Sequence, residues 1–309
     1  MAKKLFIILP ILFLLSYLLL CPREAVVASA NGLLLWFYTL LPTLLPFMIL
    51  TNLVNVMRLS DSIVYVLKPI LQPLFKISKN GCFILLMGLL CGFPMGGKLC
   101  GDFVRQGRIS IKEAQYLLTI SNMASPAFIL SYIFMSSLHI ENEIGKYLLC
   151  IYLPLFLWAI VARYFFYPDQ FILQKDNLSV TDLPKINFKI IDQCIMDAFA
   201  VITKLGGYLI LFSILSSLLQ KVPFLSLPAK NIMILFTEIT NGTRVIMDTS
   251  ISTPVKTVLV LTAVNFGGLS FLAQTASMIK DTGLSMKIYI KEKAIISIMT
   301  AFLSYILFI

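Results

Sequence analysis

The sequence predicts an all-α polytopic membrane protein, and three observations support this fold class. Of the 309 residues, 59% are hydrophobic and only 13% are charged, whereas soluble globular chains are about half apolar and about a quarter charged. The mean hydropathy is +0.90. The apolar residues also stand in long runs, and several runs reach the roughly 20 residues with which a helix crosses a bilayer. These features exclude a soluble enzyme, a disordered chain and a disulfide scaffold.

The charged and metal-ligating residues narrow the possible functions. Lys and Arg number 25 against 15 Asp and Glu, a net charge of +10, and they are spread between the apolar runs, as positive-inside topology and contact with anionic lipid require. The lipid bilayer is therefore an expected partner, whereas nucleic acid is not, because the sequence predicts no basic face on a soluble domain. The six cysteines form no C-x-x-C pair and His139 is the single histidine, so we expect no metal site and no cofactor.

Seven apolar stretches are long enough to cross the membrane. They are residues 5–20, 33–56, 113–137, 147–167, 195–219, 257–279 and 288–309. The first stretch follows Lys3 and Lys4, and no small-residue cleavage site comes after it. We therefore expect a signal-anchor helix over residues 1–25 with its N-terminus inside. Seven crossings then place the C-terminus outside.

Two shorter apolar stretches, residues 82–97 and 231–242, contain glycine, proline or polar residues where a spanning helix would not place them. Such backbone is tolerated at membrane depth only where protein encloses it or where it lines a cavity. We therefore predict two re-entrant hairpins. Residues 61–76 are predicted to form an amphipathic helix on the membrane surface.

The chain divides into two similar halves, residues 26–167 and 193–309, on either side of a polar linker at residues 168–192. The polar break in LLTISNMASPAFI matches the one in VLTAVNFGGLSFL, so that Asn122 corresponds to Asn265. Upstream, MGGKL corresponds in position to TNGTR. The same element types recur in the same order, which predicts a duplication.

The loop charges predict how the two halves are oriented. Residues 57–112 carry eight basic and two acidic residues, whereas the matching residues 221–256 carry four and two. The next loop reverses this bias, because residues 139–146 carry one basic and two acidic residues and residues 280–293 carry four and two. Since basic loops face the cytoplasm, equivalent loops lie on opposite sides. This arrangement predicts an inverted repeat, the usual plan of secondary transporters.

The segment GFPMGGKL nearly spells a nucleotide-binding P-loop, but Leu99 stands where the Mg²⁺-binding hydroxyl belongs, so we reject nucleotide hydrolysis. The glycines of this segment, Gly92 together with Gly96 and Gly97, are instead predicted to form the tight turn of a hairpin tip. Lys98 would then lie beside freed amide groups, an arrangement that can bind an anion.

No residues predict catalysis, so we expect that the protein is not an enzyme. The CGD segment around Asp102 lacks the second membrane-embedded aspartate of an aspartyl peptidase, and we expect Asp102 to balance Lys98 or Arg105. The single His139 is far from any G-x-S-x-G motif, which argues against a Ser-His-Asp triad.

The second hairpin places Glu238 and Asn241 in an apolar setting. A carboxylate inside a membrane is costly unless it is paired, so Glu238 is either a functional group or one partner of a structural ion pair. Polar side chains also stand at the predicted helix breaks, namely Asn122, Ser125, Asn265 and Gln274. Each alone is more often a hydrogen bond between helices than a ligand. Together, at equivalent places in two repeats, they predict a substrate-binding site.

Four segments carry a family resemblance: NGLLLWFYTLLPTLLPF, CGFPMGGKLCGDFVRQGRISIKEAQYLLTISNMASPAFI, TEITNG and NFGGLSFLAQT. Taken in order, they resemble the YlbJ sporulation integral membrane protein family, part of the wider nucleoside-recognition or Gate-domain proteins. The resemblance covers nearly the whole chain. This chain is shorter than typical members, and ASP at residues 124–126 stands where Gly-Pro is expected.

The resemblance implies two Gate-like repeats, at residues 26–167 and 193–309, and a role in endospore formation. The family is associated with moving dipicolinate from the mother cell across the outer forespore membrane, so the resemblance implies a multi-pass protein of that membrane in a sporulating cell. Relatives with Gate domains include nucleoside carriers, the ferrous-iron transport B membrane core and the spore maturation proteins A and B.

Three hypotheses follow for the function. The first is a carrier of a small organic anion, with dipicolinate favoured, and the second is a carrier of a nucleoside or another small polar solute. The third is a non-transporting membrane scaffold for spore assembly. Polar groups that converge from both repeats favour a carrier, whereas hairpins packed shut around an ion-paired Glu238 favour the scaffold. The sign of the charge around the cavity separates the first two hypotheses. The sequence leaves the oligomeric state, the coupling ion and the direction of transport open.

Overall fold

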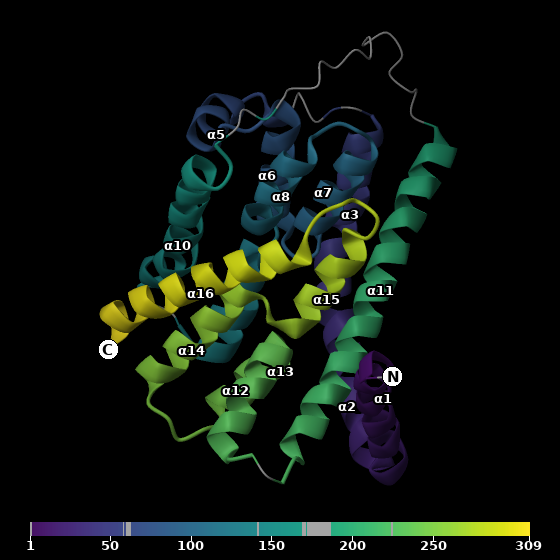
Figure 1. The fold of residues 1–309 in the computed structure, drawn as a ribbon, viewed down its shortest axis with the longest axis vertical. Helices are drawn as coiled ribbons and strands as arrows, with labels where there is room; N and C mark the ends of the chain where they lie inside the picture. Colours follow the sequence, from purple (N-terminus) through teal and green to yellow (C-terminus); the bar gives the residue numbers. More distant parts are fainter. Residues whose placement is uncertain are drawn as a thin grey trace.

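The computed structural model describes residues 2–57, 59, 63–140, 142–168, 171, 187–223 and 225–309, and every regular element within these ranges is a helix (Figure 1). Most of the predicted polar linker at residues 168–192 therefore lies outside the described residues. The all-α class is confirmed for the part of the chain that the structure describes.

The first half of the chain contains short and long helices. They are α1 (Ala2–Leu20), α2 (Pro22–Leu35), the π-helix η1 (Trp36–Leu40), α3 (Leu41–Val56), α5 (Lys68–Phe75), α6 (Lys79–Cys91), α7 (Met95–Arg105), α8 (Ile111–Ser121), α9 (Pro126–Phe128), the π-helix η2 (Ile129–Leu138) and α10 (Ile144–Phe165). The second half contains α11 (Phe188–Gln220), α12 (Leu227–Thr237), α13 (Ile239–Met247), α14 (Thr253–Phe266), α15 (Gly268–Met278) and α16 (Met286–Phe308).

Five helical stretches of the described chain are long and apolar enough to cross a membrane, and the seven predicted crossings are not confirmed. The five are Pro22–Val56, Ile111–Leu138, Ile144–Phe165, Phe188–Gln220 and Thr253–Met278. A sixth is present if α5 and α6, which meet at a bend of 102°, form one broken span. The predicted crossing at 33–56 extends back to Pro22, because α2, η1 and α3 run on without interruption.

The predicted crossing at 288–309 is not confirmed, because three charged residues, Lys291, Glu292 and Lys293, lie within its first turns. The loop-charge count assigned these residues to the loop at 280–293, but they lie inside α16. The predicted crossing at 5–20 falls on α1, of which the short segment Ile11–Leu20 is apolar.

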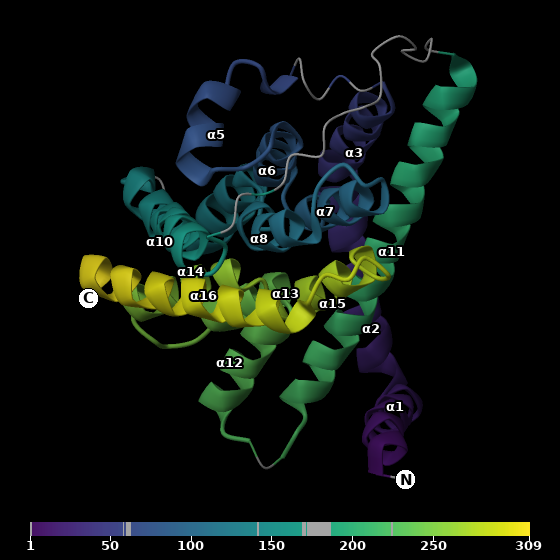
Figure 2. The same ribbon diagram turned by 45° about the horizontal axis from the view of Figure 1, so that its top comes forward.

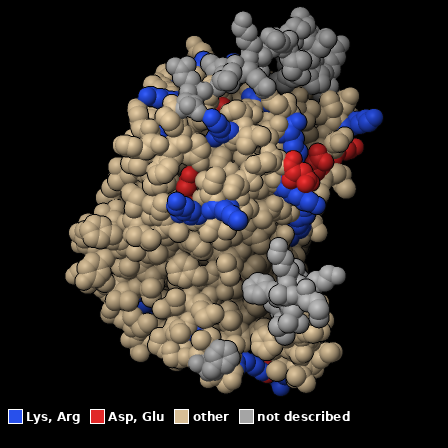
Figure 3. All heavy atoms as spheres, viewed as in Figure 1, with Lys and Arg blue, Asp and Glu red and all other residues tan. Residues whose placement is uncertain are grey.

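The outer surface of the molecule is apolar over a wide area. Figure 3 shows a broad surface without charged side chains, whereas Lys and Arg gather mainly in the upper part of this view. Leu19, Leu20 and Phe165 are each more than three-quarters exposed. Soluble monomers rarely expose contiguous apolar patches of this kind. The surface therefore indicates contact with lipid around a multi-pass membrane protein.

Two helical hairpins occupy opposite parts of the molecule. The first hairpin, α6–α7, lies in the upper part of Figure 1, and the second hairpin, α12–α13, lies in the lower part. The chain reverses between α6 and α7 at Gly92, where φ is +74° and a side chain would collide with the backbone of Ser125, so only glycine fits. In the second hairpin the chain reverses at Glu238, which has an extended backbone. The breaks predicted within residues 82–97 and 231–242 are therefore present.

Two of the long helical stretches are broken in the middle. The stretch Ile111–Leu138 breaks between Ser121 and Pro126, and Thr253–Met278 breaks at Gly267. The two halves of the molecule meet around these breaks, because α7 packs on α15, α13 on η2, α8 on α16 and α10 on α14. The helices α3 and α11 lie side by side in both ribbon views (Figure 1 and Figure 2).

Candidate functional site

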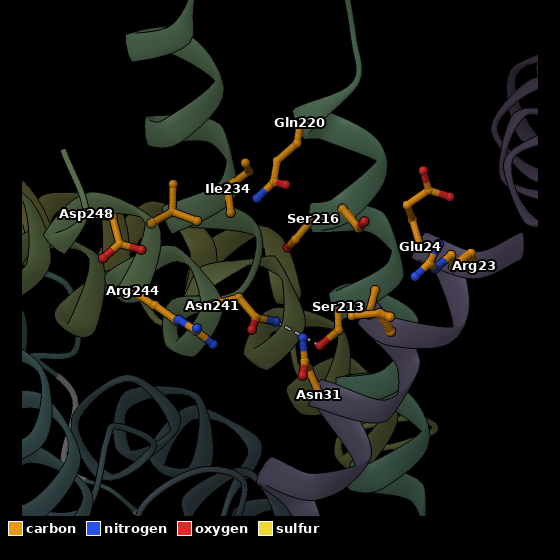
Figure 4. A pocket seen from close by; sticks show the side chains of 14 residues that line it. Arg23, Glu24, Asn31, Ser213, Ser216, Gln220, Ile234, Asn241, Arg244 and Asp248 are labelled. Atoms are coloured by element: carbon orange, nitrogen blue, oxygen red, sulfur yellow. Dashed lines mark hydrogen bonds between the residues drawn. The ribbon is translucent and has the colours of Figure 1, made fainter. Parts of the chain in front are cut away.

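A polar pocket of about 640 Å³ lies between α2, α11, α12 and α13 (Figure 4). This volume is typical of a site for a small molecule, for which about 300–1,000 Å³ is usual. The polar lining residues are Arg23, Glu24 and Asn31 of α2, Ser213, Ser216, Ser217 and Gln220 of α11, and Asn241, Arg244 and Asp248 at α13. Of the residues predicted from sequence to bind substrate, Asn241 lines this pocket.

The pocket wall formed by α13 depends on Glu238. The fully buried Glu238 carboxylate caps the helix, because it accepts hydrogen bonds from the backbone N–H groups of Thr240 (3.1 Å) and Asn241 (2.8 Å) and from the Thr240 hydroxyl. A negative group at a helix N-terminus is stabilised by the free amides and by the helix dipole. Glu238 is therefore held by hydrogen bonds rather than by an ion pair. The helix that it starts places Asn241 and Arg244, three residues apart, on one face.

The opposite wall is formed by α2 and α11. The Asn241 side-chain amide donates a hydrogen bond of 2.9 Å to Ser213 Oγ, which joins α13 to α11. Figure 4 shows Arg23 and Glu24 on one side of the pocket and Arg244 and Asp248 on the other. The pocket thus brings together residues from both ends of the chain.

The pocket lining carries two basic residues, Arg23 and Arg244, and two acidic residues, Glu24 and Asp248. Glu24 is held by Lys221, whose Nζ lies 2.6 Å from the Glu24 carboxylate, and this hydrogen bond raises the pKa of Lys221. Among the residues that the structure describes, no salt bridge joins Arg23 or Arg244 to a carboxylate. Guanidinium groups bind carboxylates in a two-pronged geometry. These two guanidinium groups are therefore available to the carboxylates of an anion.

A second group of predicted site residues meets at the centre of the molecule. The Gly97 N–H donates to Asn122 Oδ1 (3.1 Å), and Asn122 Nδ2 donates to Thr275 Oγ1 (2.8 Å) and to the Tyr289 hydroxyl (3.0 Å). Asn122 thereby joins α7, α15 and α16. These bonds satisfy its side chain, so that Asn122 holds the two halves together in this conformation.

Of the glycines predicted to form the tight turn of the first hairpin, Gly92 lies at the turn, whereas Gly96 and Gly97 come after it. The turn lies at residues 92–94, and Gly96 and Gly97 stand in the first turn of α7. A side chain at Gly96 would collide with the Ser121 carbonyl oxygen, whereas one at Gly97 would make only ordinary contacts. The small size of Gly96 therefore serves close packing against the end of α8.

Lys98 does not lie beside free amide groups in this conformation. Its ammonium group donates to Asn52 Oδ1 (3.0 Å) and to Asp102 Oδ2 (2.8 Å), and the other oxygen of Asp102 accepts from Arg105 (3.0 Å). The prediction that Asp102 balances these basic residues is confirmed.

The remaining predicted site residues lie near the two helix breaks. Ser125 caps α9 and lines a small cavity of about 50 Å³. Asn265 donates to the Ile151 carbonyl (2.9 Å) and to Thr300 Oγ1 (2.6 Å), and Gln274 donates to Ser270 Oγ (3.1 Å). The side-chain oxygens of Asn265 and Gln274 are buried with no partner in the described chain. Asn122 and Asn265, which the sequence predicts to occupy equivalent positions in the two halves, thus have different partners.

The sequence analysis missed three basic residues. Arg23 follows the anchor helix, Arg244 lies three residues after Asn241, and Lys293 is buried within α16. The spacing of Asn241 and Arg244 could have indicated that both line one site, because residues three apart lie on the same face of a helix. Nothing local in the sequence places Arg23 opposite them.

The fold and the sites define the class of protein: a multi-pass helical membrane protein with two helical hairpins, two broken helices and a polar pocket at one side. No family model matches the chain, and no solved structure matches it. The chain is similar to the sporulation integral membrane protein YlbJ of Bacillus subtilis (strain 168), with 27% identity over 312 residues that cover 89% of this chain and 76% of the relative. The resemblance to the YlbJ family predicted from the sequence is confirmed.

Proposed function

We propose that the protein is a carrier of small organic anions in a spore-forming cell, with dipicolinate as the favoured substrate. The observation that carries this proposal is the pocket with Arg23 and Arg244 on opposite walls (Figure 4). Dipicolinate has two carboxylates, and two guanidinium groups match them in charge and number. The similarity to a sporulation integral membrane protein supports the setting of a sporulating cell, and we propose the outer forespore membrane as the location.

An inverted repeat supports the carrier mechanism. The contacts between the halves are reciprocal, because α7 packs on α15 as α13 packs on η2, and α8 packs on α16 as α10 packs on α14. In each of these two cases, a helix of the first half packs on a helix of the second half, and the two corresponding helices also pack on each other with the halves exchanged. Two hairpins that enter from opposite sides fit a pseudo-two-fold axis in the membrane plane. We propose on this basis that residues 26–167 and 193–309 are Gate-like repeats and that both hairpins are re-entrant.

The two sides of the molecule fit one state of an alternating-access cycle. On the side of the first hairpin, Lys98 is held by Asn52 of α3 and by Asp102. On the side of the second hairpin, Asn241 and Arg244 face the open pocket. In the opposite state, Lys98 would be released and would contact the anion. No nucleotide-binding motif is present in the sequence, so transport would follow a gradient or depend on a partner.

Uptake into proteoliposomes tests this function. The full chain is reconstituted and supplied with labelled dipicolinate or labelled uridine. We expect uptake of dipicolinate, and we expect Arg244→Gln to lower its rate roughly tenfold or more, because a hydrogen bond to a charged group contributes about 1.5–3 kcal/mol. Lys146→Gln is the matched control, since this exposed lysine pairs with Glu143 outside the pocket.

Each other outcome selects a different hypothesis. Uptake of uridine but not dipicolinate would favour a nucleoside carrier, to which the amide side chains of Asn31, Gln220 and Asn241 could donate and accept hydrogen bonds. Uptake of neither compound, at matched protein abundance, would favour the scaffold. Unchanged dipicolinate uptake by the Arg244→Gln protein would remove the pocket from the transport path.

A further inference from the structure

Lys293 is a buried basic residue that the pocket does not use. Its side chain is fully buried within α16, and its ammonium nitrogen has no hydrogen-bond partner among the residues that the structure describes. No salt bridge joins it to a carboxylate of the described chain. The neighbouring Glu292 accepts a hydrogen bond of 2.9 Å from the Tyr167 hydroxyl. The other Glu292 oxygen, Oε2, has no hydrogen-bond partner in the described chain and forms no salt bridge with Lys293.

The surroundings of Lys293 place it where the two halves meet. One turn before it, Tyr289 bonds to Asn122 at the break of the first half. One turn after it, Ser297 donates to the Thr262 carbonyl (3.2 Å). Two turns after it, Thr300 accepts from Asn265 (2.6 Å) near the break of the second half. Lys293 thus lies between the two helix breaks on the α16 face that contacts both.

The tip of the first hairpin covers Lys293. Its Nζ lies 5.3 Å from the centroid of the Phe93 ring and 6.0 Å from that of Tyr289. Phe93 follows the turn at Gly92, and its ring stacks on Phe271 of α15 with centroids 4.4 Å apart. Movement of the first hairpin would therefore carry Phe93 away and expose the ammonium group to whatever occupies the centre.

An ammonium group in this setting lacks the partner that a structural lysine has. Removing a charge from water costs several kcal/mol, whereas contact with an aromatic face returns only about 0.5–2 kcal/mol. Lys98 and Lys221 each have such a partner, because the ammonium nitrogen of each lies within 2.8 Å of a carboxylate oxygen. A buried basic residue inside a membrane protein without such a partner marks a site for a charged solute.

We propose that Lys293 is the central binding residue for a carboxylate of the transported anion. This inference rests on the proposed function and extends it, since it adds a second binding point beyond the pocket of Arg23 and Arg244. The anion enters from that pocket, and one carboxylate pairs with Lys293 when Phe93 withdraws. The ligand class is a small mono- or dicarboxylate.

Binding and uptake measured on the same variants test the inference. The probe is labelled dipicolinate, added to the purified full chain for equilibrium binding and to proteoliposomes for uptake. Lys293→Met keeps the length of the side chain and removes its charge. Lys293→Arg keeps the charge, and Lys291→Met is the matched control, because that neighbouring lysine is exposed. We expect Lys293→Met to weaken binding at least tenfold, Lys293→Arg to retain binding within about threefold and Lys291→Met to change it less than twofold.

Thermal unfolding separates a binding role from a structural one. We expect the Lys293→Met protein to unfold at the same temperature as the natural protein or higher, since the change removes a buried unpaired group. Added dipicolinate should raise the unfolding temperature of the natural protein and leave that of Lys293→Met unchanged. A structural role predicts the reverse, namely a lower unfolding temperature and an intact response to dipicolinate.

The outcomes distinguish this inference from the function on which it rests. If the natural protein binds and transports dipicolinate and Lys293→Met does so equally well, the inference alone is wrong. If the natural protein binds dipicolinate through Lys293 but moves none across the membrane, the carrier function is wrong and the binding residue stands. If the natural protein neither binds nor transports it, both are overturned.

Discussion

The two hairpins have the same arrangement of two short helices, but their charged side chains have different partners. In α7 of the first hairpin, Lys98 and Asp102 are four residues apart and form a salt bridge of 2.8 Å. In α13 of the second hairpin, Arg244 and Asp248 have the same spacing, and no salt bridge joins them. Identical spacing therefore gives a closed surface in one case and an open pocket in the other.

Their neighbours explain this difference. Asn52 of α3 accepts a hydrogen bond from Lys98, and Arg105 donates to the Met278 carbonyl (2.7 Å) as well as to Asp102. The charged side chains of α7 are thus tied to α3 and α15. In the second hairpin, α2 and α11 present Arg23 and serine hydroxyls across a space of about 640 Å³. The pairing of charges depends on what faces the helix more than on the helix itself.

The largest expected effect concerns the contact between α12 and α13. A side chain at Gly242 would collide with the Leu235 backbone, so Gly242→Ala should prevent the second hairpin from closing. We expect a loss of about 3 kcal/mol in stability from overpacking, measured as a lower thermal unfolding temperature of the purified protein. Gly207→Ala is the control, because nothing lies within 4 Å of that position. Equal unfolding temperatures for the two variants would show that the second hairpin does not depend on this contact.

A smaller effect is expected at the two helix breaks. Asn122 has partners for its amide oxygen and nitrogen, whereas the Asn265 oxygen has none in the described chain. Removing a partner from a buried hydrogen-bonded group costs about 1–3 kcal/mol. We therefore expect Asn122→Ala to destabilise the protein by about 2 kcal/mol and Asn265→Ala by less. Chemical or thermal unfolding of both variants shows which one loses more stability. A larger loss for Asn265→Ala would contradict the central role of Asn122.

The smallest effect tests whether the ion pair closes the side of the first hairpin. We expect Asp102→Asn to release Lys98 and to raise the rate of maleimide labelling at the buried Cys194, whose carbonyl accepts a hydrogen bond from Asn52. A salt bridge near the surface contributes about 0.2–1 kcal/mol, so the rate should rise at most about fivefold. Cys21, which is already partly exposed, serves as the internal control. An unchanged rate at Cys194 would show that packing rather than charge closes this side.

The features that the sequence predicted correctly are determined by residues that lie close together in the chain. Glycine, proline and polar residues inside apolar runs predicted both hairpin breaks and both broken helices, because such residues disturb a helix wherever they stand. The pairing of Asp102 was predictable for the same reason, since its partners lie three and four residues away.

The features that the sequence did not predict depend on contacts between residues that lie far apart in the chain. The pocket brings Arg23 together with Arg244, more than 200 positions later in the chain, and no local pattern encodes that approach. Lys293 belongs to a cluster of charges that is typical of a loop, but α16 begins at Met286 and carries it into the interior. The crossing predicted at residues 288–309 is not confirmed for the same reason.

The hydrogen bonds of Asn122 restrict which motions are easy. Its amide group binds Gly97 on one side and Thr275 and Tyr289 on the other. Sliding the first half past the second would break the bonds to Thr275 and Tyr289, at about 1 kcal/mol each. A rotation centred on the amide group would keep every donor and acceptor in place. Asn122 therefore acts as a pivot, and rocking of one half against the other is the low-energy motion of this architecture.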